Sequence, residues 1–531
     1  MEPERRTGWE APEDGASDGA RRLRIAATVA LYALAGAALL LPALLNGFPL
    51  VMGDTWRYVR EADGLYSWAS SQFYGYLLRL FAGSSLWLVA ALQAAAALYV
   101  VAAFFRRVLH ATHVHAAVAV ALVALTSSLG FFTSLVMTDL LVGLGLVAAA
   151  TLLLTSRWRW SDLPLLVVVA FATAAHPVAF VLFGVLGVAS VAAVAVARAS
   201  TGRWTRLPRT GLFAGSVAAG AVALTISNAI VWDKATPNPH SSVATFAYLY
   251  FHGDLDRQLE ECERWDVCAL PRTAPRWPDR PQLFDFASRD LSEFNWFLFD
   301  GDTSILWKEF GGPTAFAGTV RAIVLDHART DPIGYARRIA SSGSEQLFEI
   351  RALDHLEWMT QYLSERHTAL LATHNEGDPA RFERSRQFRQ TLDLAWTSDV
   401  TRAFALLGAV AAAGAGLVSF GRAVVRRPLR REGFSTAIRA SLLLLACYVA
   451  HAFVVGTSTY PTPRYGGRVA WLLVLALWAL AYGAVAAYGL TRRGEALLGP
   501  RVHEDDVAQP SDGEADVKDL GGASSGPRKS R

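Results

Sequence analysis

The sequence predicts an all-α integral membrane protein of about ten transmembrane helices, with a mostly helical outer domain inserted between helices seven and eight. Of its 531 residues, 53% are hydrophobic and only 18% are charged, a balance typical of multi-spanning membrane proteins. The apolar residues form separate runs, most of them long enough to cross a bilayer as a helix. Arginine is concentrated in the short loops on one side of these runs. This distribution indicates membrane topology and argues against a nucleic-acid partner.

Ten apolar runs are expected to span the membrane, in two membrane parts over 25–231 and 401–489. Their expected limits are 25–45, 84–105, 114–133, 137–155, 163–176, 178–197, 211–231, 401–420, 436–456 and 467–489. The run 163–176 is too short to cross a bilayer alone. A second interpretation therefore places the turn near Gly184 and leaves His176 inside a helix.

Arginine placement predicts the orientation of these spans. Loops expected on the side of the N-terminus contain Arg106, Arg107, Arg157, Arg159, Arg203, Arg206, Arg209, Arg422, Arg426, Arg427, Arg430, Arg431, Arg492 and Arg493. The opposite short loops contain only Arg464. Because basic loops stay in the cytoplasm, we expect a multi-pass protein of the inner (plasma) membrane with both termini cytoplasmic. Its tails are 1–24 and 490–531, and the second is expected to be disordered.

Two segments are then expected on the outer face. The first, 46–83, mixes charged with aromatic residues, which suits helices lying in the membrane interface. The second, 232–400, has the size of an ordinary folded domain and is expected to be periplasmic and mostly helical, with one helix starting at Pro332. In an oxidising compartment Cys262 and Cys268 are expected to form a disulfide, because their spacing does not match a zinc pair.

Polar residues gather where the expected spans meet the outer face. Asp54 follows the first span, Asp139 opens the fourth, and His176 lies near the turn between the fifth and sixth. Further candidates in the outer loops and at the outer ends of later spans are Arg57, His240, Tyr460, Arg464, Tyr465 and Arg468. Charged groups close to hydrocarbon cost free energy unless they are solvated, paired or metal-bound, so they often mark function.

Each of these residues also has a purely structural interpretation. Asp54 and Asp139 would cap the helices that they begin. His176 would bond a backbone group beside Pro177, and Arg464 would extend toward lipid headgroups.

Taken together, the residues suit transfer from a lipid phosphate. A carboxylate can take a proton from an acceptor hydroxyl, or hold a divalent cation such as Mg²⁺ or Mn²⁺. An arginine can bind a phosphate through two parallel hydrogen bonds.

This layout resembles the GT-C class of integral membrane glycosyltransferases, which use polyprenyl-phosphate-linked sugars. The shared features are the many spans, an aromatic-rich first outer loop, and an acidic residue early in that loop, here Asp54 within 51–55. Asp139 lies where many members carry a second acidic residue. Around 137–140, 175–177, the cysteine segment and 464–471, the chain is also similar to uncharacterised proteobacterial multi-pass membrane proteins.

The resemblance implies Asp54 and Asp139 as catalytic residues and the other polar candidates as substrate-binding residues. The sequence departs from some members at Thr55, where they carry a second acidic residue, so it leaves the metal requirement open.

We therefore expect a glycosyltransferase that moves a sugar from a polyprenyl-phosphate donor in the bilayer to a cell-envelope glycan, lipid or protein. One alternative is a transporter or flippase of a lipid-linked or anionic solute, which would usually show repeated halves; no internal repeat is evident. Another is a non-enzymatic envelope assembly protein whose function resides in 232–400. Such a protein would not need charges at the membrane face.

Overall fold

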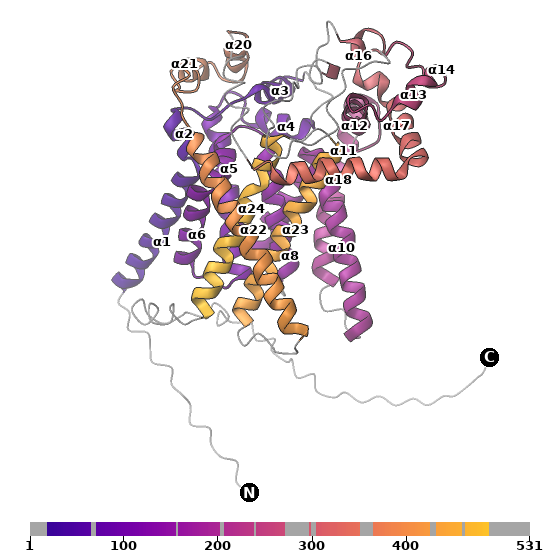
Figure 1. Cartoon of the computed structure of the whole chain (residues 1–531). Coiled ribbons are helices and arrows are strands. Elements are labelled where there is room, and N and C mark those ends of the chain that lie inside the picture. Colours follow the sequence, from indigo (N-terminus) through magenta and orange to yellow (C-terminus); the bar gives the residue numbers. More distant parts are fainter. Residues whose placement is uncertain are drawn as a thin grey trace, which may run out of the picture.

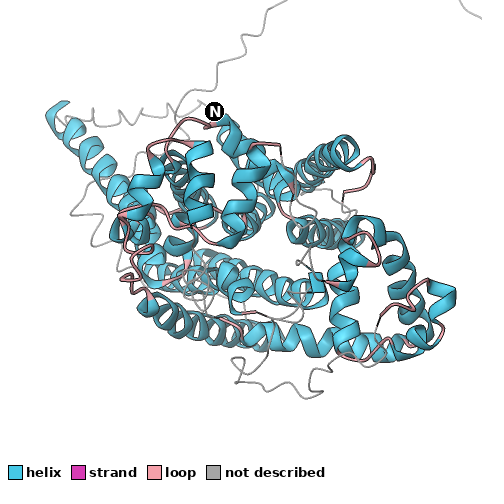
Figure 2. Ribbon diagram, turned by 90° about the horizontal axis from the view of Figure 1, so that it is seen from above, coloured by secondary structure: helices cyan, strands magenta, loops and turns pink. Residues whose placement is uncertain are grey.

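The part of the chain that the structure describes is mostly helical. This computed structural model covers residues 18–64, 71–155, 158–201, 207–237, 240–270, 297–298, 304–350, 365–424, 432–458 and 462–487. Within these ranges there is no strand (Figure 2), and one isolated backbone bridge joins Leu50 to Leu135. Seven of the described helices are long and apolar enough to cross a bilayer. The prediction of an all-α membrane protein is confirmed at this level.

The bundle combines these seven long helices with shorter apolar ones. The long helices are α1 (Asp18–Leu39), α5 (Leu86–Val108), α10 (Pro177–Thr201), α11 (Leu207–Trp232), α22 (Ala395–Val424), α23 (Glu432–Ser458) and α24 (Pro463–Ala487). The shorter ones at positions of predicted spans are α6 (His113–Thr126), α8 (Asp139–Leu154) and α9 (Leu163–Ala175). Since α8 has 16 residues, it is about 24 Å long, less than the ~30 Å of a bilayer core.

The predicted continuous span 114–133 is wrong, because the helix breaks at Ser127. This residue adopts an extended conformation, with φ −148° and ψ 173°. Its hydroxyl donates to the Val123 carbonyl at 2.5 Å and accepts from the Leu129 amide at 3.2 Å. Such local side-chain bonds compete with the helical pattern. The chain therefore restarts as the short helix α7 (Leu129–Ser134).

The turn between the fifth and sixth apolar runs lies at His176. Helix α9 ends at Ala175 and α10 begins at Pro177, while His176 between them is extended, with φ −140° and ψ 117°. A proline disfavours helical geometry in the residue before it, which explains the position of this turn. The alternative turn near Gly184 is wrong, because Gly184 lies inside α10.

The two described ends of the chain lie at the same end of the bundle. In Figure 1 the start of α1 and the end of α24 lie at the bottom, whereas α12, α17, α20 and α21 lie at the top. The segment between α11 and α22 is thus on the opposite side from both ends. The assignment of one side to the cytoplasm rests on the arginine distribution in the sequence.

A reporter that is active only outside the cytoplasm is expected to give signal when fused after residue 300 and none when fused after residue 430. The reason is that arginine-rich loops such as the one around Arg426 are retained inside. Activity measured in intact cells checks both fusions. The reversed pattern would place the polar residues discussed below on the cytoplasmic face.

The segment predicted as one outer domain forms two parts with separate packing. Its helices are α12 (Ser241–Phe251), α13 (Asp256–Glu260), α14 (Cys262–Trp265), α16 (Ile305–Lys308), α17 (Pro313–Thr330), α18 (Pro332–Phe348), α20 (Glu365–His374) and α21 (Asp378–Glu383). The described residues of 240–330 (240–270, 297–298 and 304–330), here called the outer lobe, bury their own core, to which Phe246 and Val320 belong. In contrast, Phe382 of α21 packs into the main bundle core, with its ring 5.8 Å from Phe48 and 5.9 Å from Trp56.

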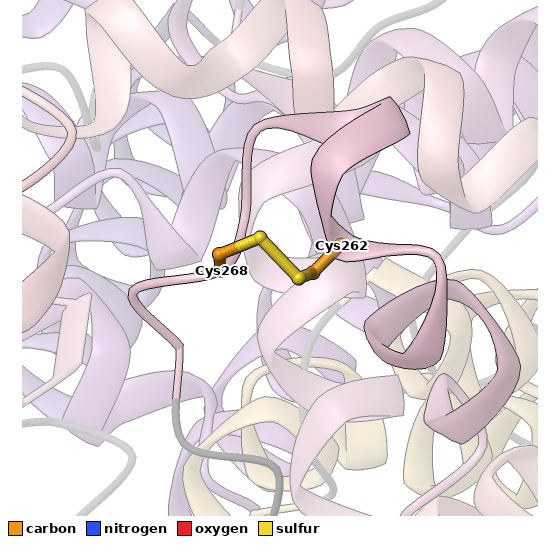
Figure 3. The surroundings of a disulfide bond; sticks show 2 residues. All are labelled: Cys262 and Cys268. Atoms are coloured by element: carbon orange, nitrogen blue, oxygen red, sulfur yellow. A yellow bond between two sulfur atoms is a disulfide. The ribbon is translucent and has the colours of Figure 1, made fainter.

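A disulfide joins Cys262 to Cys268 in the outer lobe (Figure 3), with 4.8 Å between their Cα atoms. We expect both thiols to resist alkylation in freshly isolated membranes until a reductant is added. Mass spectrometry of the labelled peptides checks this. A loop this short contributes less than the ~3 kcal/mol expected of a 15-residue loop, so Cys262→Ser should lower folding yield only moderately. Free thiols before reduction would argue for a cytoplasmic lobe.

Three aromatic residues of the first outer loop point into the core, while Phe73 and Tyr76 are partly exposed. Helices α3 (Gly53–Ala62) and α4 (Gln72–Leu80) pack against each other beneath Phe382. Trp56, Tyr58 and Tyr74 are buried, and the rings of Tyr58 and Tyr74 meet edge to face with 5.0 Å between their centroids. The same loop carries Asp54, so this packing gives that carboxylate a rigid support.

Candidate functional site

The site is organised around Arg464, which joins two carboxylates far apart in the sequence. Its Nη1 donates to Asp54 Oδ2 at 2.6 Å, and its Nε donates to Asp139 Oδ2 at 2.8 Å. The sequence separations are 410 and 325 residues. Hydrogen bonds between a guanidinium and a carboxylate are short and roughly twice as strong as neutral ones. Arg464 therefore ties α24 to both α3 and α8.

A second arginine, Arg468, lies one turn deeper in α24. Its Nη1 donates to Asp139 Oδ1 at 3.1 Å and lies 2.9 Å from Nε2 of His176. Its Nε donates to Nε2 of His451 at 3.1 Å. Arg468 and Asp139 are each 1% exposed, and His451 is fully buried. In this inner half of the cluster only His176 is partly exposed, with 12% of its side-chain surface accessible.

The other half of the cluster reaches the surface. Arg57 Nη2 lies 3.0 Å from Asp54 Oδ1, and the side chains of Arg57 and Asp54 are 26% and 21% exposed. Arg464 stands between the two halves, with its side chain 12% exposed. Three guanidinium groups thus meet two carboxylates, so the cluster carries one net positive charge when its histidines are neutral. Among these charged side chains, those of Asp54 and Arg57 are the most exposed.

Asp54 is held in place by the loop that precedes α3. Leu50 pairs with the chain before α8, since its amide donates to the Ser134 carbonyl at 2.9 Å and its carbonyl accepts from the Val136 amide at 3.0 Å. The Thr55 hydroxyl adds a bond to the Val136 carbonyl at 3.0 Å. Gln387, from the distant segment before α22, bonds the backbone of the adjoining Val51 through its side chain. The loops bearing Asp54 and Asp139 are therefore directly cross-linked.

Close packing between α8 and α24 sets the depth of Asp139 and Arg468. A Cβ on Gly143 would lie 2.7 Å from the Trp471 ring, so the two helices meet where no side chain fits. Gly143 lies one turn after Asp139, and Trp471 lies one turn after Arg468. Trp471 also donates from its Nε1 to the Arg468 carbonyl at 3.0 Å.

Asp54 is outside the membrane-spanning helices, and its pKa reflects two opposing effects. Burial alone would raise the pKa of this carboxyl, but Arg57 and Arg464 more than compensate and hold it below its ordinary value. Asp54 is therefore ionised at neutral pH. Because its carboxylate is stabilised by two cations, it is a weak base for as long as both of them remain bound to it.

Neither aspartate serves as a helix cap, so the structural interpretation of both is wrong. Helix α8 begins at Asp139 itself, and the residue before it, Thr138, makes no side-chain cap. Asp54 likewise lies inside α3, whose N-cap is Met52. Both carboxylates are directed to arginine instead. Arg464 does not extend toward lipid headgroups either, because its Nη1 and Nε are bonded within the cluster.

The three remaining predicted residues are Tyr465, His240 and Tyr460, and the structure treats each of them differently. Tyr465 belongs to the cluster, because the Arg468 guanidinium lies over its ring at 4.7 Å. His240 packs its ring against Trp232 instead, and burial together with Lys234 lowers its pKa to about 4 without a contribution from either aspartate of the cluster. Tyr460 lies outside the described residues.

The sequence analysis missed His451, which bonds Arg468 from inside α23. The available signal was a histidine within an apolar run, where ionisable residues are rare and usually functional. His451 lies about two turns from the outer end of α23, whereas the polar residues expected at the site lie at the outer ends of the spans.

The residues present do not fit a divalent-cation site. Among the described residues, no group of three or more His, Cys, Asp or Glu side chains comes together as a metal site. Asp54 and Asp139 converge, but the position between them is taken by the guanidinium of Arg464. Arginine thus supplies the positive charge that a metal ion would provide in this position.

In comparisons with known proteins, no family model, no curated protein and no solved structure matched the chain.

Proposed function

We propose that the chain is a membrane glycosyltransferase that moves a sugar from a polyprenyl-phosphate donor to a cell-envelope acceptor at the outer face of the inner membrane. The observation that carries this proposal is the double contact of Arg464 with Asp54 and Asp139. It joins a carboxylate and a phosphate-binding group at one end of a bundle of apolar helices. That location suits a donor whose tail lies in the bilayer.

The net charge of the cluster favours an anionic ligand. Arg57 and Arg464 are its partly exposed cations, and both reach the same carboxylate, that of Asp54. A lipid phosphate arriving at this end would compete with Asp54 for their N–H donors, since a guanidinium binds phosphate and carboxylate in the same forked geometry. Donor binding would thus free Asp54 from one or both arginines.

This exchange would prepare Asp54 to act as a general base. Its pKa is held down by Arg57 and Arg464, so once a phosphate neutralises these cations the pKa rises and the carboxylate becomes more basic. Asp54 would then take the proton of an acceptor hydroxyl. The hydroxyl oxygen bonds to the anomeric carbon of the sugar while the bond from that carbon to the phosphate oxygen breaks. The phosphate leaves with the electron pair, and the arginines stabilise its added charge.

Asp139 and Arg468 would hold Arg464 during this exchange. Both are almost fully buried, and the Asp139 carboxylate contacts the two arginines of α24. When Asp54 releases Arg464, the bond between Arg464 and Asp139 can persist and keep the Arg464 guanidinium in place. This division of roles assigns proton transfer to Asp54 and positioning to Asp139.

Arg464→Lys is expected to lower the transfer rate by about 10²–10³-fold, the loss typical of removing one preorganised donor. A lysine ammonium keeps the charge, but it cannot reproduce the fork by which Arg464 contacts Asp54 and Asp139 together. Sugar transfer by the purified protein checks this. The matched control is Arg79→Lys, an exposed arginine at the end of α4, which should retain activity. Full activity in Arg464→Lys would contradict the proposed phosphate contact.

A further inference from the structure

Gln346 of α18 holds the residue at which α24 begins. Its Nε2 donates to the Thr462 carbonyl and its Oε1 accepts from the Thr462 amide, both at 3.0 Å. Thr462 is the last residue before α24, and Arg464 follows two positions later. Gln346 is fully buried. One side chain thus satisfies both backbone groups of the residue that sets the start of the helix carrying Arg464.

The C-terminal half of α18 is packed too closely against α23 and α24 to move independently of them. The Ser342 hydroxyl donates to the Gly456 carbonyl at 2.6 Å. A Cβ on Gly466 would lie 1.5 Å from the Glu349 carbonyl oxygen. A Cβ on Gly456 would likewise lie 2.8 Å from the backbone of Ser342. Glycine is therefore required at positions 456 and 466. A displacement of α18 would have to move the start of α24.

The other half of α18 is fixed to the outer lobe. Arg338 forms a forked pair with Asp254, with Nε and Nη2 at 2.7 and 3.0 Å from the two carboxylate oxygens. Its Nη1 lies 3.1 Å from Nδ1 of His252. Arg338 and Gln346 are eight residues apart on α18, about 12 Å along the helix. Figure 1 shows this helix lying crosswise to the bundle, between the outer lobe and α24.

We infer that Gln346 is a positioning residue for Arg464, and that α18 is the element through which the outer lobe sets the position of this arginine. The inference rests on the proposed function, in which Arg464 binds the donor phosphate. Arg464 makes bonds of 2.6 and 2.8 Å with carboxylates on two other helices. A shift of 1 Å at a reacting centre can cost about 10²-fold in rate. Loss of the Gln346 bonds to Thr462 would therefore weaken the site by displacing the start of α24, although every group that touches the substrate is still present.

The test compares two substitutions of Gln346 in the full-length protein. Gln346→Met keeps the size of the side chain and removes both bonds to Thr462, whereas Gln346→Glu keeps the acceptor and removes the donor. The control is Ser344→Ala on the same helix, whose hydroxyl bonds the Ser341 carbonyl of its own turn. The two measurements are the affinity for polyprenyl phosphate without a sugar, and hydrogen exchange of the amides of residues 464–470.

We expect Gln346→Met to weaken polyprenyl-phosphate affinity at least about ten-fold and to speed amide exchange at the start of α24. Gln346→Glu should fall between Gln346→Met and the wild type, and Ser344→Ala should match the wild type in both measurements. Asp254→Asn weakens the pair between the outer lobe and Arg338 of α18, and it should change both measurements in the same direction as Gln346→Met.

Two results would overturn the inference. One is wild-type amide exchange at residues 464–470 in Gln346→Met. The other is faster exchange in that variant with unchanged affinity for polyprenyl phosphate. If the wild type itself does not bind polyprenyl phosphate while Gln346→Met still speeds exchange, the proposed function fails and the positioning of α24 by Gln346 stands.

Discussion

Asp54→Asn is expected to abolish sugar transfer in a protein that still inserts into the membrane and accumulates normally. The change is nearly isosteric but removes the only group that the proposed mechanism uses as a base. General-base assistance contributes about 10²–10⁴-fold, so the loss should be large. The loss of stability should be smaller than that of Asp139→Ala, because the Asp54 side chain is 21% exposed whereas that of Asp139 is 1% exposed.

The matched control for this change is Asp63→Asn at the end of the same helix. Asp63 is exposed and accepts a hydrogen bond from the Thr373 hydroxyl at 2.9 Å, away from the arginines of the cluster. The Asp63→Asn protein should be as active and as stable as the wild type. An active Asp54→Asn protein would remove Asp54 from catalysis. Loss of activity in both variants would point to a general effect on α3.

Asp139→Ala is expected to destabilise the folded protein by about 3–5 kcal/mol, the cost of leaving a buried charge without its partner. Asp139 binds both Arg464 and Arg468 and is 1% exposed. Without it, Arg464 would keep only Asp54 as a carboxylate partner and Arg468 would lose the carboxylate that it contacts. Thermal unfolding of the purified protein in detergent should show a clear fall in the midpoint relative to Asp54→Asn.

A double variant separates the charge effect from the loss of packing. Adding Arg468→Met to Asp139→Ala restores the net charge of the cluster to that of the wild type, because one cation and one anion are removed together. Part of the lost stability should return, as it does when a whole buried ion pair is replaced by apolar residues. An Asp139→Ala protein as stable as the wild type would contradict the positioning role given to Asp139.

The sequence could predict which residues meet, because topology alone constrains them. Once the spans alternate, Asp54, Asp139, His176 and Arg464 all fall at the outer ends of helices. Neighbouring helices of a bundle pack about 8–10 Å apart, so long side chains at adjacent outer ends can meet. The cost of charge near hydrocarbon then makes pairing among them more favourable than isolation. The direct bonds of Arg464 to both aspartates follow this reasoning.

Features that depend on long-range packing could not be predicted in this way. The outer segment divides into two parts because Phe382 fits against Phe48 and Trp56, more than 300 residues earlier in the chain. No periodicity within the segment records that contact. The break at Ser127 depends on two local hydroxyl bonds, which a hydropathy pattern does not show. The clamp of Gln346 on Thr462 likewise requires knowing which helices cross.

The most direct test of the account is a transfer assay in liposomes that contain the purified protein. The liposomes would hold a panel of polyprenyl-phosphate-linked radiolabelled sugars and would be mixed with envelope acceptors. The account predicts that wild-type protein moves label from the lipid fraction to the acceptor fraction for at least one sugar, and that Asp54→Asn leaves it in the lipid. Label that crosses the bilayer still attached to its lipid would indicate transport. That result, or label that stays in the lipid with wild-type protein for every sugar, would contradict the proposed glycosyltransferase.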